Sequence, residues 1–364
     1  MTWGVIYVLL WFYRCIYSVL AETVISRLTS LGDTAQYADT LVERPLSGLA
    51  VGFSNPRYAA TALAENLGAL FTTISGGLPY FASICFQTIA FAGIVSLLRA
   101  APHRLRLLLL PFLMLPSFSI WSSVSGKEAL VVFGVGILSA LAIRMYNGEY
   151  RIGLIHILAI VIVALAKNQY LPALAFLLVG TYIARAVRQH ASLTLWAGFL
   201  SLVMLYLVRD QVSSMIVDVA MHFDGLGSSR PPFWSQPSDA LTKAPLGMLL
   251  AFFGPTLSEA SSGILQMITF VESSILLGLL VLVLLIRLPT MPVYMALMGG
   301  FTLFWILFAA YPLGVMNAGS AIRYRTGHQI LIMALVVIIM SREQYVSWRK
   351  HRPPQLRRTP MSSM

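Results

Sequence analysis

Charged side chains are scarce in this sequence. They make up 11% of the 364 residues, whereas hydrophobic residues make up 58%. A soluble domain carries roughly 25% charged residues, so this chain has too few of them to cover a surface that faces water. The composition excludes an ordinary soluble protein and indicates a protein that lies in a lipid bilayer.

Cysteines and the common catalytic motifs are also scarce. The two cysteines, Cys15 and Cys85, fall within apolar stretches, where such residues are typically small apolar fillers. The sequence contains no GxxxxGK[ST] phosphate loop, no HExxH pair, no nucleophile elbow and no Cys/His cluster with metal-ligand spacing. These absences disfavour ATP-driven transport by this chain, a zinc site and the familiar soluble hydrolases.

Long apolar stretches, in contrast, are abundant. A helix needs about 20 apolar residues to cross a membrane. Ten stretches reach or approach this length: 3–21, 79–98, 105–121, 129–146, 152–166, 171–186, 193–208, 270–287, 293–311 and 327–341. The stretch 246–256 is apolar but too short, which predicts a re-entrant or interfacial segment. We therefore predict an all-α, polytopic transmembrane bundle of about ten spans, forming a single domain over residues 1–342.

The distribution of basic residues predicts the orientation of this bundle, because loops on the cytoplasmic side are rich in Lys and Arg. In the predicted inside segments Glu149 and Glu343 are the only acids, and the basic residues include Arg99, Arg104, Arg106, Arg144, Arg151, Arg185, Arg188, Arg287 and those of the tail 343–364. Both termini are thus predicted to be cytoplasmic. The basic tail suits contact with anionic lipid. We therefore do not interpret the net charge of +11 as a sign of nucleic-acid binding, and we predict no nucleic-acid partner.

The first stretch and the two long outer loops need separate mention. Residues 3–21 lack a basic start and are interrupted by Arg14, so a retained span is favoured over a cleaved signal peptide. Arg14 needs a partner, a polar cavity or access to the interface, and its role stays open. The outer loops are predicted at about 22–78, with an amphipathic helix near Ala59–Ile74, and at about 209–269.

Polar residues cluster at the predicted outer ends of spans. After the first span come Asp33, Tyr37 and Asp39, whose carboxylates suit a general base or a divalent cation. The alternative is that Asp33 caps a helix that begins at Thr34. Asp33 has no adjacent acid, so no cofactor is predicted beyond an open question about a divalent cation.

A second cluster, Trp121 to Glu128, joins the third and fourth predicted spans. Ser125 and Glu128 have the spacing of a helix capping box, which leaves Lys127 and Trp121 unexplained. A third cluster, Lys167 to Tyr170, includes Gln169 and is wedged between two spans. Lys167 could line a cavity or extend to the interface.

The fourth cluster precedes the last span and contains Asn317, Arg323 and Arg325. Arginine forks bind phosphate and carboxylate in bidentate fashion, so these arginines favour a phosphate contact over an ion pair within the protein. In the second long loop, the chemistry-bearing residues are Arg230, Trp234 and Glu259, with Glu272 near the same membrane boundary.

Four of these patches together resemble a family. They are GDTAQY at 32–37, PSFSIWSSVSGKEAL at 116–130, FFGPTLSEA at 252–260 and NAGSAIRYR at 317–325. The combination resembles bacterial polysaccharide polymerases of the Wzy or EpsG-like type and the related GT-C-type membrane glycosyltransferases. The resemblance implies action on polyprenyl-(pyro)phosphate-linked sugars at the outer face of the bacterial inner membrane, alongside other polysaccharide-synthesis proteins.

The resemblance also implies roles for individual residues. Asp33 matches an acidic residue that acts as a base or a metal ligand, while Lys127, Arg323 and Arg325 match cations that hold the lipid pyrophosphate. Glu128 is expected to orient Lys127, and Lys167-Asn168 stand where similar sequences carry Arg-Pro. The substrate-binding set is predicted to comprise Tyr37, Asp39, Trp121, Lys167, Gln169, Arg230, Trp234, Glu259 and Asn317.

Two other classes stay open at this point. A flippase or other transporter for lipid-linked glycans predicts ionisable residues through the midplane of the membrane. A non-catalytic subunit of a synthesis complex predicts no convergence of these clusters. Convergence of the outer residues in space therefore separates the glycosyltransferase from the subunit.

Overall fold

The computed structural model describes residues 2–28, 37, 56–186, 191–222 and 230–341. Within these ranges the secondary structure is helical, with no strand. The longer helices are α1 (Trp3–Leu20), α5 (Pro56–Ile74), α6 (Pro79–Ala100), α7 (His103–Leu113), α9 (Lys127–Asn147), α10 (Leu154–Lys167), α11 (Leu171–Ala186), α12 (Ala191–Leu207), α13 (Arg209–Met221), α15 (Ala244–Phe253), α17 (Ile264–Arg287), α18 (Val293–Gly314) and α19 (Ala318–Met340).

Short elements connect them. These are the π-helix Ala21–Ile25, α2 (Ser26–Leu28), α8 (Pro116–Trp121), the 3₁₀ turns Asn168–Tyr170 and Leu288–Thr290, α14 (Asp239–Thr242) and α16 (Leu257–Ala260). The prediction of an all-α protein is confirmed over the described residues. The tail 343–364 lies outside them.

Seven of the described helical stretches are long and apolar enough to cross a membrane, or eight when the bent pair α12 and α13 is counted as one span. These helices support a multi-pass membrane protein, whereas the predicted number of about ten spans is not confirmed. The difference arises mainly at two places where the sequence predicts separate spans.

The stretch 105–121 does not form one span. It divides into α7 and α8, and Leu115 between them is extended, with φ −56° and ψ 131°. Pro116 explains the break, because its ring disfavours helical geometry at the preceding residue and it has no N–H to donate. The 11 residues of α7 rise only about 16 Å, which is roughly half of the hydrocarbon core.

The predicted spans 152–166 and 171–186 correspond to α10 and α11. Together these two helices count as one candidate membrane span, Leu154–Ile183. Helical geometry is interrupted at Lys167, where φ is −159° and ψ is 78°. Both helices pack against α9. The interruption places the polar turn Asn168–Tyr170 inside this helical stretch.

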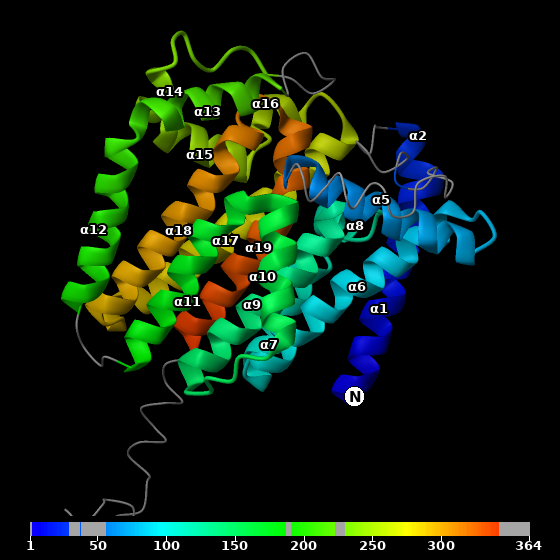
Figure 1. The fold of residues 1–364 in the computed structure, drawn as a ribbon, viewed down its shortest axis with the longest axis horizontal. Helices are drawn as coiled ribbons and strands as arrows, with labels where there is room; N and C mark the ends of the chain where they lie inside the picture. Colours follow the sequence, from blue (N-terminus) through cyan, green and yellow to red (C-terminus); the bar gives the residue numbers. More distant parts are fainter. Residues whose placement is uncertain (1, 29–36, 38–55, 187–190, 223–229, 342–364) are drawn as a thin grey trace, which may run out of the picture.

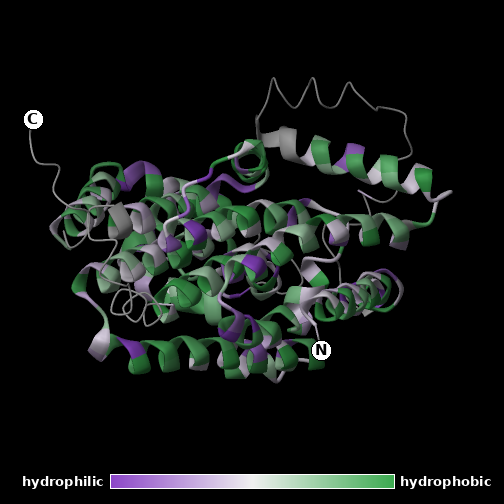
Figure 2. Ribbon diagram, turned by 90° about the horizontal axis from the view of Figure 1, so that it is seen from below, coloured by the Kyte–Doolittle hydropathy of each residue, from purple (hydrophilic) through white to green (hydrophobic). Residues whose placement is uncertain are grey.

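Two helices form the centre of the bundle. α9 and α19 are the most buried of the candidate spans, and they pack against each other. α6 lies against α9 through paired glycines: a Cβ added to Gly93 or Gly136 would come within 2.6 Å of the opposite backbone. Small residues at such contacts let membrane helices approach closely. Hydrophobic residues cover most helices, and hydrophilic residues gather toward the middle (Figure 2).

The upper end of the bundle in Figure 1 carries α2, α5, α8 and α13–α16, while the N-terminus lies at the lower end. α5 and α13 run across this upper end, consistent with the helices expected in the two long loops. α15 is confirmed as too short to span, since its 10 residues rise about 15 Å. α9 and α19 both begin toward the upper end, so their first turns can meet there.

Candidate functional site

An ion-pair cluster lies where α9, α10 and α19 meet. Glu128 in the first turn of α9 accepts hydrogen bonds from Arg323 Nε at 2.7 Å and Arg323 Nη2 at 3.3 Å. Lys167 Nζ lies 3.2 Å from Glu128 Oε1. Glu128 and Lys167 are buried, and Arg323 is 12% exposed. Three predicted site residues from distant parts of the chain therefore converge on one carboxylate.

Two aromatic rings complete this cluster. The Arg323 guanidinium lies 5.6 Å from the centre of the Trp121 ring and 5.7 Å from that of Tyr324. Lys167 Nζ lies 3.3 Å from the centre of the Tyr324 ring. Cations on aromatic faces are attracted by the ring quadrupole. Tyr324 was missed by the sequence analysis, although its position between two arginines was a usable signal.

Lys127 points elsewhere from the start of α9. Its Nζ donates a hydrogen bond to Thr61 Oγ1 of α5 at 3.1 Å. Successive residues on a helix point about 100° apart, so Lys127 and Glu128 face different neighbours. The expectation that Glu128 orients Lys127 is thus wrong: Glu128 binds Lys167 and Arg323 instead.

The predicted capping box at the start of α9 is not formed. The N-cap of α9 is Gly126, and it makes no side-chain cap hydrogen bond. The Ser125 backbone N–H donates to Ser83 Oγ of α6 at 3.0 Å. The Glu128 carboxylate accepts from its own backbone N–H and forms the ion pairs with α10 and α19.

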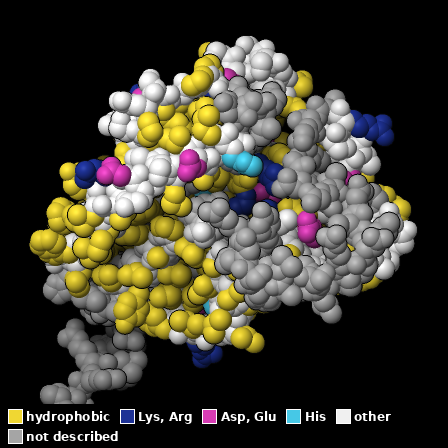
Figure 3. All heavy atoms as spheres, turned by 45° about the horizontal axis from the view of Figure 1, so that its top comes forward, with side chains coloured by type: hydrophobic (Ala, Val, Ile, Leu, Met, Phe, Trp, Pro, Cys, Tyr) yellow, Lys and Arg dark blue, Asp and Glu magenta, His cyan; other side chains and the backbone are white. Residues whose placement is uncertain are grey.

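Among the described residues, the ion pairs of this cluster join two cations, Lys167 and Arg323, to one acid, Glu128. Arg323 and Lys127 both repel the charge of Lys167, whereas Glu128 attracts it. Among the described residues no acid lies within ion-pair distance of Lys127. Figure 3 shows basic and acidic side chains together near the middle of the upper face. Such an arrangement attracts an anion with several oxygen acceptors.

A second layer holds α19 against the turn after α10. Tyr170 Oη donates to the Tyr324 carbonyl at 2.7 Å, and the same carbonyl accepts from His328 Nδ1 at 3.0 Å. The Tyr170 and His328 rings stack with centres 4.1 Å apart. These contacts fix the backbone of Tyr324, and with it the ring beneath Lys167.

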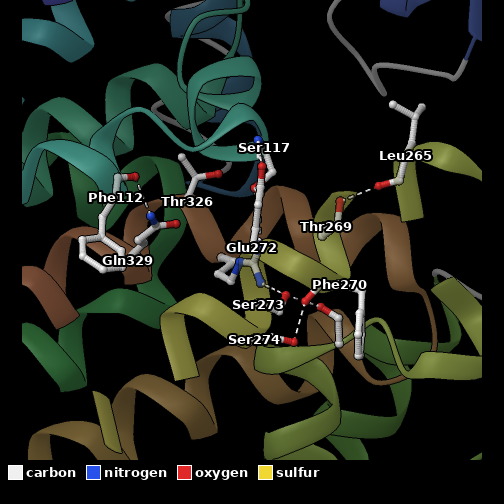
Figure 4. A network of polar contacts seen from close by, with 12 residues as sticks. Phe112, Ser117, Leu265, Thr269, Phe270, Glu272, Ser273, Ser274, Thr326 and Gln329 are labelled. Carbon is white, nitrogen blue, oxygen red and sulfur yellow. Dashed lines mark hydrogen bonds and ion pairs between the residues drawn. The ribbon is translucent and has the colours of Figure 1, made fainter. Parts of the chain in front are cut away.

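Arg325, predicted to hold phosphate beside Arg323, lies in a separate buried network. Its guanidinium donates to Ser273 Oγ, to Ser117 Oγ at 3.3 Å and to the Phe252 carbonyl at 3.4 Å. Glu272 lies 3.9 Å from it. Figure 4 shows Glu272 directed toward Ser117, whose backbone N–H donates at 3.0 Å and whose hydroxyl also donates.

A third arginine is saturated in the second long loop. Arg230 forms a bidentate ion pair with Glu259, with Nε to Oε1 at 2.5 Å and Nη2 to Oε2 at 3.2 Å. Its Nη1 donates to the carbonyls of Gly314 and Val315. Burial alone would raise the pKa of Glu259, but the hydrogen bonds from Arg230 and the Thr256 N–H hold this pKa below its usual value.

Four other predicted residues take no part in the ion pairs around Glu128, although the Tyr37 ring lies beside Gly126, two residues before Glu128. Trp234 Nε1 donates to Tyr311 Oη at 2.7 Å. Asn317 is the N-cap of α19, and its Oδ1 accepts from the Ser320 N–H at 2.9 Å. Tyr37 is fully buried, and its backbone lies close to Gly68 of α5. Gln169 is half-buried in the turn after α10.

Asp33 and Asp39 lie outside the described residues, so their predicted roles stay predictions. Within the described ranges, no three His, Cys, Asp or Glu side chains are grouped so that they could hold a metal ion. A groove of about 530 Å³ lies between α12, α13, α15 and α18, and none of the predicted site residues lines it.

The cluster around Glu128 can therefore bind an anion at the upper end of the bundle, with aromatic rings beside the cations. Comparison with known proteins adds no relative: no family model, no curated protein and no solved structure matches this chain.

Proposed function

We propose that this protein is a membrane glycosyltransferase or polysaccharide polymerase that acts on polyprenyl-(pyro)phosphate-linked sugars. The observation that carries this proposal is the convergence of Lys167 and Arg323 on Glu128, with Lys127 next to Glu128 in sequence and directed toward Thr61 of α5. Glu128, Arg323 and Lys127 come from the patches that resemble Wzy-type and EpsG-like polymerases, whereas Lys167 stands where similar sequences carry Arg-Pro. Their convergence is what a catalytic role requires and what a non-catalytic subunit does not.

The chemistry of glycosyl transfer suits this cluster. When the sugar leaves its lipid carrier, negative charge develops on the (pyro)phosphate, and fixed cations stabilise it. Arg323 can offer a planar fork to phosphate oxygens, and Lys127 a point charge. Trp121 lies beside Arg323, where it can stack on a sugar ring. Asp33 is proposed as the base that accepts the proton of the attacking hydroxyl.

The proposed orientation puts the cluster at the outer face of the bacterial inner membrane, with both termini in the cytoplasm. Lys and Arg dominate the segments at the other end of the bundle, which supports this orientation. Termini on one side require an even number of crossings, and the higher count of eight is even.

A second candidate is translocation of the same lipid-linked saccharides. The Glu272–Arg325 pair favours it, because both residues are buried between candidate spans. Ionisable residues within the membrane are functional candidates by default. This pair, however, is fully engaged with Ser117, Ser273 and the Phe252 carbonyl, which supports a structural role.

The test is reconstitution of the purified protein in liposomes with a polyprenyl-pyrophosphate-linked oligosaccharide. Longer saccharide chains on the lipid, resolved by gel electrophoresis, support a polymerase. These longer chains should be lost in Arg323→Met and retained in the control Arg99→Met. The Arg99 guanidinium faces the Tyr7 ring from the last turn of α6. Movement of the unaltered lipid-linked saccharide between leaflets, with no new glycosidic bond, would replace this proposal with the transporter.

A further inference from the structure

α1 carries a polar face that the proposed chemistry does not use. At intervals of four residues come Arg14 and Ser18 in α1 and Glu22 in the π-helix Ala21–Ile25 that continues it, so these residues lie roughly along one side. Arg14 and Ser18 are fully buried. A buried cation in a membrane helix is costly and is retained where it has a partner or a task.

The partners of this face are successive residues of one segment. Arg14 Nη2 donates to Ser122 Oγ at 2.5 Å and to the Ser122 carbonyl at 3.3 Å. Ser18 Oγ donates to the Ser123 carbonyl at 2.9 Å. The contacts therefore run in the same order along α1 and along the chain after α8.

The order continues upward through the next two residues. Ala21 packs against Val124 in a small buried cluster. Ser83 Oγ of α6 bridges the last pair: it donates to Glu22 Oε1 at 2.6 Å and lies 3.0 Å from Ser125 Oγ. Each residue of the segment 122–125 is thus held by α1 or by the π-helix that continues it, directly or through Ser83.

This segment joins two parts of the proposed site. Trp121, which lies beside the Arg323 guanidinium, directly precedes the segment 122–125. Lys127 follows the segment after one intervening residue, Gly126. The α9 N-cap makes no side-chain hydrogen bond that could fix the start of the helix. Contacts outside α9 must therefore set where Lys127 and Trp121 stand.

We propose that Arg14, Ser18 and Glu22 are positioning residues: they hold the segment 122–125 and thereby place Lys127 for binding the (pyro)phosphate and Trp121 for stacking on the sugar. This inference rests on the proposed function for its ligand. Arg14 is its central member, since it contacts both the backbone and the side chain of Ser122 and lies 5.2 Å from the centre of the Phe118 ring in α8.

The first test measures binding of inorganic pyrophosphate to the purified protein in detergent by isothermal titration calorimetry. Arg14→Met should raise the dissociation constant several-fold, and Arg14→Lys, which keeps the charge, should restore part of the affinity. The matched control Arg99→Met removes a guanidinium that also faces α1, at Tyr7, and should leave the affinity unchanged.

A double-mutant cycle separates positioning from simple destabilisation. If Arg14 acts through Lys127, then Arg14→Met should have little further effect on pyrophosphate affinity when Lys127→Met is already present. Additive losses from the two substitutions would overturn the proposal, as would an Arg14→Met protein that binds pyrophosphate as tightly as the parent chain.

Hydrogen exchange decides the inference independently of any ligand. Amide exchange of residues 122–126 should become faster in Arg14→Met and stay unchanged in Arg99→Met. Unchanged exchange in Arg14→Met would overturn the positioning role. A parent chain that binds no pyrophosphate, while the segment loosens in Arg14→Met, would instead refute the proposed anion site and leave the structural part of the inference standing.

Discussion

Arg323 and Arg325 lie two residues apart on α19, yet they occupy different environments. Arg323 is partly exposed and shares Glu128 with Lys167, in a cluster that has more cations than acids. Arg325 is buried and is surrounded by acceptors: Glu272, two serine hydroxyls and a carbonyl. Residues two apart on a helix point about 200° away from each other. α19 therefore places two arginine side chains in environments on opposite sides of the helix.

The difference separates binding from architecture. A buried guanidinium whose Nη1 and Nη2 groups donate to acceptors inside the protein stabilises the fold and is not placed to meet a ligand. A guanidinium at the edge of a cation-rich cluster can exchange or share its carboxylate with an incoming phosphate. The structure therefore assigns to Arg325 a structural role in place of the phosphate contact expected from the sequence.

The largest expected effect is on stability, from Arg325→Met. The substitution leaves Glu272 buried without its cation and should lower the free energy of unfolding by about 3–5 kcal/mol. Thermal unfolding in detergent is the measurement. Arg323→Met should lower the unfolding temperature less, because Lys167 still neutralises Glu128. Equal losses in the two variants would erase the contrast between the arginines.

The next effect is on activity, from Arg323→Met. Loss of a cation that stabilises the leaving group should slow formation of polymer by about 100-fold, measured as product per unit time in liposomes. Arg323→Lys keeps the charge but not the planar guanidinium fork, so its rate of polymer formation should lie between those of the parent chain and Arg323→Met. Full activity in Arg323→Met would show that the cluster around Glu128 does not serve the reaction.

A smaller effect tests how tightly Arg325 is held. Ser273→Ala removes one acceptor of its guanidinium and should cost about 1–3 kcal/mol of stability, again measured by thermal unfolding. The matched control is Ser274→Ala, because Ser274 bonds only within its own helix, to the Phe270 carbonyl (Figure 4). No difference between these neighbours would indicate that the network around Arg325 carries little energy.

The smallest expected effect concerns the third arginine, Arg230. Glu259 has a pKa held below its ordinary value of 4.5 by Arg230 and the Thr256 N–H, against the opposing effect of burial. A depressed carboxyl pKa stabilises the fold above the ordinary value, and this contribution is lost as pH falls through the lower, folded-state pKa.

The unfolding temperature should therefore drop as pH is lowered from 4.5, and by less in Glu259→Gln than in the parent chain. Asp218→Asn serves as the control, since Asp218 lies in α13 of the same long loop, whereas Arg230 pairs with Glu259. A parent chain and a Glu259→Gln variant with the same pH dependence would show that the Arg230–Glu259 pair contributes nothing to it.

Hydropathy was enough to predict where the helices lie, but it did not predict how many of them are candidate membrane spans. Apolar composition over about 20 residues predicts a span, and α9, α17, α18 and α19 follow that rule. Pro116 lies within an equally apolar stretch and breaks it into α7 and α8. The strength of a helix break depends on the neighbours that satisfy the freed carbonyls, which a sliding count of apolar residues does not contain.

The candidate site could be predicted in part. The residue types at Lys127, Glu128, Lys167 and Arg323 pointed to anion chemistry, and Glu128, Lys167 and Arg323 do meet, whereas Lys127 is directed toward Thr61. The partner of each one could not be predicted: Glu128 was assigned to Lys127, its neighbour in sequence, whereas it binds residues 39 and 195 positions away. Tyr324, Thr61 and the polar face of α1 were missed for the same reason.

The sequence by itself determined that this chain is helical, lies in a membrane and carries its spare ionisable groups in short clusters, because these properties follow from composition and helical period. The tertiary structure alone decided which arginine faces a cation-rich cluster and which is buried among acceptors. That choice depends on the residues that α9, α10, α15 and α17 bring to opposite sides of α19, and these residues are remote in the chain.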